Sequence, residues 1–160
     1  MQQHSSSSHR TIAPLANPAS APVSTAYGAL LLRISLAAMW ISHALLKLLV
    51  FGLPGTAKYF ESVGFPGILA YPVFALEIAG GIALFLGVYA RQVALALTPL
   101  LLAAASVHFG NGWVHTSAGG GWEYPVFLIV ASLVLWLVGD GAYAWARSQR
   151  LVPVSGWGRT

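Results

Sequence analysis

The sequence predicts an all-α protein built as a bundle of four transmembrane helices. Hydrophobic residues make up 57% of the 160 residues, charged residues make up only 8%, and the mean hydropathy is +0.71. Soluble domains are about one quarter charged, so this chain has too few charges to cover a water-facing surface, and we expect most of its exterior to face lipid. Four apolar stretches follow one another, each near the roughly 20 residues that a hydrocarbon core of about 30 Å requires.

The predicted spans cover residues 27–50, 68–89, 93–109 and 124–143. The third is the shortest and contains Pro99, which lacks a backbone N–H and is expected to kink the helix. Between the first two spans, the segment GLPGTAKYFESVGFPG has Pro-Gly turns near both ends and an amphipathic middle. It predicts a short amphipathic helix at the membrane surface, in the first outer loop.

The two ends of the chain differ from the membrane part in composition. Residues 1–26 are rich in Ser, Pro and Ala and show no apolar period, so we predict a disordered tail. Residues 144–160 contain three arginines and predict a second, basic tail after a membrane domain at 27–143. Few basic residues fall in the loops at the other ends of the spans, so the positive-inside rule predicts that both termini are cytoplasmic.

Several classes of function are not supported by the sequence. Cys is absent, which removes disulfides, thiolate metal sites and Cys nucleophiles. The net charge of +4 comes from scattered basic residues rather than a stripe, so no nucleic-acid binding is predicted. We find no phosphate loop, dinucleotide fingerprint or metal-ligand spacing, and we therefore expect no metal site.

The first span carries four polar or aromatic residues on one face. At about 100° per residue they fall within an arc of roughly 80°; they are Arg33, Trp40, His43 and Lys47. Arg33 and Lys47 could simply extend toward the two headgroup layers, but His43 has no such easy route to water.

Glu77, near the middle of the second span, is the most costly residue to place in lipid. It is either neutral and hydrogen-bonded to another helix, or paired with a cation. The candidate cations are Arg33, His43 and Lys47. Gly80 and Gly81 follow it closely and would allow a neighbouring helix to approach.

His108 ends the third span and Glu123 opens the fourth, at the same outer depth as His43 and Lys47. Titratable groups that converge from separate helices are typical of binding sites in bundles. Two alternatives remain open at this point. Glu123 could only complement the dipole of its helix, and His43 with His108 could hold a b-type haem, which is the less favoured hypothesis.

These segments, in this order and spacing, resemble the DoxX family of small four-helix membrane proteins. The matching pieces are RISLAAMWISHALLKLL, KYFESVGFPG, EIAGGIALFLGVYAR, His108 and the pair Glu123–Tyr124. The resemblance covers residues 31–143 and implies a multi-pass protein of the bacterial inner (plasma) membrane, linked to sulfur or redox-stress metabolism. Members are similar to the membrane subunit of thiosulfate:quinone oxidoreductase, and others accompany oxidoreductases.

The leading hypothesis is therefore a quinone-associated component of a membrane oxidoreductase. Its expected binding residues are His43, Lys47, Glu77, His108, Glu123 and Arg33. Glu77 and His43 are the expected catalytic pair, which would relay protons, while electrons would come from a substrate or a partner protein. The alternatives are a non-catalytic anchor or assembly partner, which could also be a homo-oligomer, and a small proton-coupled transporter. The transporter is less favoured because the sequence shows no internal repeat.

Overall fold

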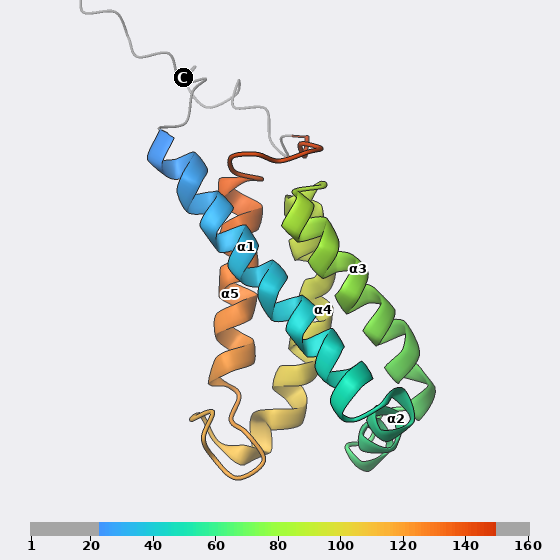
Figure 1. Ribbon diagram of the computed structural model, residues 1–160. Helices are drawn as coiled ribbons and strands as arrows, with labels where there is room; N and C mark the ends of the chain where they lie inside the picture. The colour runs from blue at the N-terminus through green and yellow to red at the C-terminus, as the bar shows by residue number, and fades with distance from the viewer. Residues whose placement is uncertain (1–22, 150–160) are drawn as a thin grey trace, which may run out of the picture.

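A computed structural model describes residues 23–149, and this part of the chain is helical without strands (Figure 1). Residues 1–22 and 150–160, which make up most of the predicted tails at 1–26 and 144–160, lie outside the described residues. The elements are α1 (Val23–Leu45), a π-helical turn η1 (Leu46–Val50), α2 (Leu53–Ser62), a short 3-10 turn η2 (Gly67–Leu69), α3 (Ala70–Leu86), α4 (Ala90–His108), a second 3-10 turn η3 (Phe109–Asn111) and α5 (Glu123–Val138).

Three of the helical segments are long and apolar enough to cross a membrane: Val23–Val50, Gly67–Leu86 and Ala90–Asn111. The fourth, α5, has 16 residues, most of them apolar. It ends at Val138, whereas the predicted span extends to residue 143. At 1.5 Å per residue it is about 24 Å long. The chain turns after Val138 because Gly139 (φ 103°) and Gly141 (φ 76°) have a left-handed backbone that glycine adopts readily.

Two other boundaries differ from the sequence prediction. Helix α1 begins at Val23, inside the segment predicted as a tail, and its first turn receives a hydrogen bond of 2.9 Å from the Ala142 amide to the Ala26 carbonyl. The turn between α3 and α4 lies at residues 87–89, so Arg91 belongs to the first turn of α4 rather than to the loop. The predicted short helix after the first span is present as α2, and Pro99 lies inside α4.

Helix α3 is wedged between α1 and α4 at two consecutive glycines. A Cβ on Gly81 would lie 2.7 Å from Ile41 Cγ1 of α1, and a Cβ on Gly80 would lie 2.6 Å from Leu97 Cδ1 of α4. The predicted close approach beside Glu77 is therefore confirmed, and it involves both neighbours. Without side chains at these positions, the helix backbones can pack closely.

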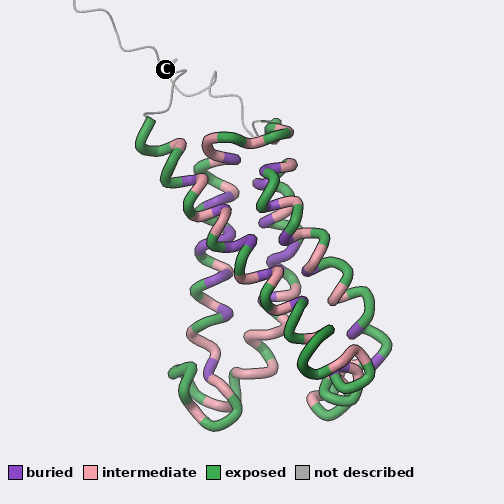
Figure 2. The backbone as a smooth tube through the Cα atoms, in the orientation of Figure 1, coloured by how far each residue is buried: buried purple, intermediate pink, exposed green. Residues whose placement is uncertain are grey.

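The half of the bundle opposite the α4–α5 loop has a closed apolar core. Figure 2 shows its buried residues on the facing sides of the helices, while the loop end is largely exposed or half-buried. Segment 139–149, which we call the strap, crosses this closed end of the bundle (Figure 1). It is held there by a backbone bridge between Val88 and Ala146 and by Asp140, whose buried carboxylate accepts hydrogen bonds from the amides of Arg91 and Ser148.

Candidate functional site

An ion pair joins α3 to the π-helical turn that follows α1. Lys47 Nζ donates hydrogen bonds to both carboxylate oxygens of Glu77, at 2.9 Å to Oε1 and 2.8 Å to Oε2. The Lys47 side chain is 17% exposed and that of Glu77 only 7%. Lys47 is therefore the candidate cation that the structure places beside Glu77.

The local backbone brings Lys47 to this position. The residue lies in η1, where the helix widens to a π-turn, and such turns re-aim side chains and are frequent at functional sites. The hydroxyl of Thr56 in α2 donates to the carbonyl oxygens of Gly52, at 3.0 Å, and of Lys47, at 3.5 Å. Helix α2 thus supports the end of the first span from the loop side.

The ion pair lies in the wall of a cavity of about 1390 Å³, in the half of the bundle nearest the α4–α5 loop. All four long helices and α2 contribute to its lining, which is mostly apolar. The polar side chains that line it are His43, Lys47, Thr56, Tyr59, Glu77, His108, His115 and Tyr124. Four of the residues expected from the sequence, from three different helical segments and the π-turn, therefore share one cavity.

The hydrogen bonds of two histidines define which ring nitrogen is free. His43 Nδ1 lies 2.9 Å from the Met39 carbonyl oxygen, and His108 Nδ1 lies 3.0 Å from the carbonyl oxygen of Gly119. Because a carbonyl oxygen only accepts, Nδ1 must carry the hydrogen, and Nε2 is then the proton acceptor of each neutral ring. The His43 ring also stacks on Tyr124 of α5, with centroids 6.2 Å apart.

His115 is a cavity residue that sequence reasoning missed. It lies in the α4–α5 loop, and Glu123 Oε1 accepts hydrogen bonds from its amide at 2.9 Å and from its Nδ1 at 2.6 Å. Glu123 stands at the loop, before the apolar stretch that begins at Tyr124, and the His115 amide and then its ring lower the pKa of the Glu123 carboxyl. Glu123 therefore reaches the site through His115. His115 and Glu123 are eight positions apart across a glycine-rich loop, so no helical period in the sequence could have indicated that they pair.

Arg33, the sixth expected binding residue, is not part of this cavity. Arg33 is only 1% exposed, so its side chain is enclosed by protein rather than extended to the surface. Nη2 donates to the Ala142 carbonyl oxygen at 3.1 Å, and Nη1 occupies the space where a side chain on Gly87 would lie. Arg33 therefore joins α1 to the strap and to the α3–α4 turn, at the closed end of the bundle.

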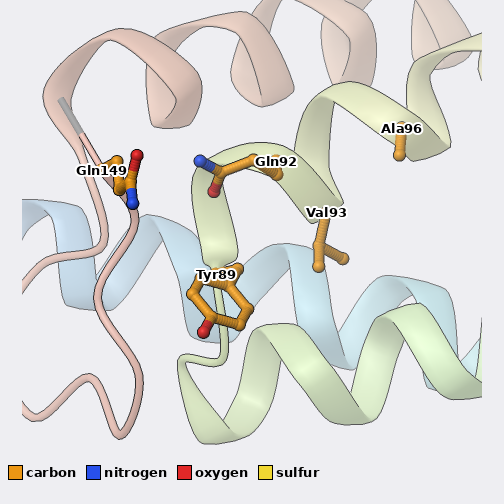
Figure 3. Close-up of a pocket in the computed structure, with 5 residues that line it drawn as sticks. All are labelled: Tyr89, Gln92, Val93, Ala96 and Gln149. Atoms are coloured by element: carbon orange, nitrogen blue, oxygen red, sulfur yellow. The ribbon is translucent and has the colours of Figure 1, made fainter. Parts of the chain in front are cut away.

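A second, smaller cavity of about 500 Å³ lies at the strap end (Figure 3). Its lining residues are Tyr89, Gln92, Val93, Ala96 and Gln149. It contains none of the residues expected to be functional. Among residues 23–149, no group of three or more His, Asp or Glu side chains is placed to hold a metal ion.

The family model for DoxX matches residues 28–111, slightly more than half of the chain. The chain belongs to the DoxX family. Together with the three long apolar helices, this membership indicates a multi-pass membrane protein. The matched DoxX region includes His43, Lys47, Glu77 and His108, whereas His115 and Glu123 lie beyond it.

A curated relative of this DoxX protein is the Bacillus subtilis protein named "Putative oxidoreductase CatD". The two are 31% identical over 114 residues, which cover 71% of this chain and 80% of the relative. No solved structure matches the chain significantly.

Proposed function

We propose that this DoxX protein is a quinone-associated component of a membrane oxidoreductase system, and that the quinone head group binds in the large cavity. The observation that carries the proposal is the Lys47–Glu77 ion pair in the wall of a mostly apolar cavity, inside a membrane protein. Binding sites for small molecules are typically apolar with a few polar groups that fix orientation. A quinone head group combines an apolar ring with two carbonyl acceptors and suits such a lining.

The residues of the cavity fit the chemistry that a quinone requires. A bound quinone would supply an acceptor for two electrons and two protons. The electrons would come from a partner oxidoreductase or a reduced substrate. The Lys47 ammonium can donate a hydrogen bond to a carbonyl oxygen of the ring. His43 Nε2 and the Glu77 carboxylate can hold and transfer protons, which are the catalytic roles we assign to them.

The same proposal includes an orientation in the bacterial inner membrane. The start of α1 and the strap lie at the same end of the bundle (Figure 1), where Arg91 and Arg147 are found. Lys58 lies in α2, near the other end. The positive-inside rule therefore favours a cytoplasmic strap end and a cavity on the outer side. The link to sulfur or redox-stress metabolism rests on the family resemblance, and the link to oxidoreductases is also supported by the name of the relative.

The test is a reduced-minus-oxidised absorption spectrum of the detergent-purified protein, extended into the ultraviolet where quinones absorb. We expect a quinone difference signal that is lost in Glu77→Gln and His43→Ala and retained in Gln92→Ala, a change at the smaller cavity. A featureless spectrum from fully folded protein would contradict tight quinone binding.

A second candidate function is a non-catalytic membrane anchor for a partner oxidoreductase. It is favoured by the same ion pair, because Lys47 and Glu77 also clamp the first and second spans together. In that case, Glu77→Gln would lower bundle stability and partner recovery without changing any spectral signal.

A further inference from the structure

The walls of the large cavity differ in chemistry between its loop end and the side formed by α3 and α4. Toward the loop the lining includes His108 and His115, which can contact water. On the α3 and α4 side, outward from Glu77, the lining is apolar: Pro72, Val73 and Leu76 from α3, and Leu100, Ala103 and Ala104 from α4. A membrane protein can expose such an apolar wall to lipid without a desolvation cost.

The cavity reaches the outer surface of the bundle on this side. Leu76 lines the cavity and is nevertheless 54% exposed, so it stands at the opening rather than deep inside. The α4 residues opposite are small, and Ala103 and Ala104 are half-buried. From their close contact at Gly80 and Leu97, α3 and α4 diverge toward the loop end (Figure 1).

Three other directions are more closed, whereas the loop end and the side of α2 also have exposed lining residues, among them Phe51, which is 63% exposed. Between α1 and α5, the stacked rings of His43 and Tyr124 narrow the passage. Between α1 and α3, Gly81 lies against Ile41 with no room for a Cβ. Toward the strap, the floor of the cavity is the core residue Trp40, which is 2% exposed.

We infer that the gap between α3 and α4 is a lateral portal to the bilayer, and that it holds the apolar tail of the quinone while the head group lies at Lys47 and Glu77. This inference rests on the proposed function and adds the route of entry and the class of ligand, an amphiphile whose tail remains in lipid. The class of ligand follows from the shape of the passage, because its apolar walls lead from the hydrocarbon layer to a polar pair. A long-tailed quinone has the matching distribution of apolar and polar parts.

The experiment compares two quinones that share a head group, decylubiquinone with a ten-carbon tail and ubiquinone-0 without one. Their affinities are measured by quenching of tryptophan fluorescence in nanodiscs, with Trp40 in the cavity wall as a built-in reporter. Ala104→Phe places a bulky ring in the portal. Ala75→Phe makes the same change on an exposed position of α3 that does not line the cavity.

We expect Ala104→Phe to weaken decylubiquinone about tenfold, a change of about 1.4 kcal/mol, with little effect on ubiquinone-0. Unchanged ubiquinone-0 binding also demonstrates that the variant is folded. Ala75→Phe should leave both affinities unchanged. Should Ala104→Phe fail to fold, Leu76→Ala decides instead, because it widens the portal and should accelerate decylubiquinone association.

Two results would overturn the portal while leaving the proposed function intact. One is an equal loss of affinity for both quinones in Ala104→Phe, and the other is binding of decylubiquinone that neither portal variant changes in affinity or rate. Absence of binding of either quinone to the wild-type protein would instead overturn the proposed function, and the portal with it.

Discussion

Lys47 and Glu77 are thirty residues apart in the chain, and their side chains meet with both N–O distances under 3 Å, at 2.8 and 2.9 Å. The lysine comes from a π-helical turn and the carboxylate from the middle of α3, so the pair joins the first two spans where the large cavity begins. A charge pair in this position can hold two helices together and can also contact a ligand in the cavity. Its two roles can be separated experimentally.

Glu77→Gln should destabilise the protein, because it leaves the Lys47 ammonium beside a mostly apolar wall without a counter-ion. Breaking a fully buried pair costs 3–5 kcal/mol, and the partial exposure of Lys47 reduces our expectation to about 2 kcal/mol. The measurement is unfolding in detergent as part of a double-mutant cycle. Adding Lys47→Met should restore part of the loss, and strictly additive single effects would contradict a direct interaction.

Gly81→Ala should separate α1 from α3, because its Cβ would lie 2.7 Å from Ile41 Cγ1 and 3.1 Å from the Ile41 amide nitrogen. We expect a loss of about 1–3 kcal/mol, typical of overpacking. The matched control is Gly28→Ala, since Gly28 lies in α1 with nothing within 4 Å of an added Cβ. Equal melting temperatures for the two variants would show that close packing at Gly81 is unimportant.

Arg33→Gln should affect stability and leave ligand affinity unchanged, because Arg33 contacts the strap and lies outside the large cavity. Loss of its hydrogen bond to the Ala142 carbonyl should cost about 1–3 kcal/mol, as for other charged hydrogen bonds. Thermal unfolding and quinone titration of the same sample separate the two effects. A fall in affinity as large as that of Lys47→Met would return Arg33 to the binding residues.

The chain contains no cysteine, so single cysteines can report the orientation of the bundle directly. Thr116→Cys lies in the α4–α5 loop and Tyr143→Cys in the strap, and both positions are exposed. A membrane-impermeant maleimide should label Thr116→Cys in spheroplasts and Tyr143→Cys in inside-out vesicles. The reverse pattern would place the cavity on the cytoplasmic side and refute the orientation inferred from the basic residues.

The helical architecture could be predicted because its signals are local. Long apolar runs predicted the spans, and the amphipathic segment after the first of them predicted α2. The end of α5 was placed too late, although the sequence Gly139-Asp140-Gly141 disfavours a helix and could have indicated an end at Val138. In the structure, Asp140 instead accepts hydrogen bonds from Arg91 and Ser148, and these distant contacts hold the strap in place.

The site was only partly predictable because sequence reveals depth in the membrane but not the direction of each side chain. Helical phase placed Arg33, His43 and Lys47 on one face of the first span. That face extends along the whole helix, however, and its two ends lie in different parts of the bundle. Arg33 lies at the strap and Lys47 at the cavity. His115 was missed because its relation to Glu123 depends on the conformation of a loop, which has no periodic pattern.

The most direct test of the central claim is a titration of the purified protein in nanodiscs with decylubiquinone, followed by tryptophan quenching, for wild type, Lys47→Met and Gln92→Ala. If the head group binds beside the Lys47–Glu77 pair, wild type and Gln92→Ala should show the same saturable binding, and Lys47→Met should bind at least about tenfold more weakly. Equal affinity in all three proteins, or quenching that never saturates, would contradict a quinone site at this ion pair.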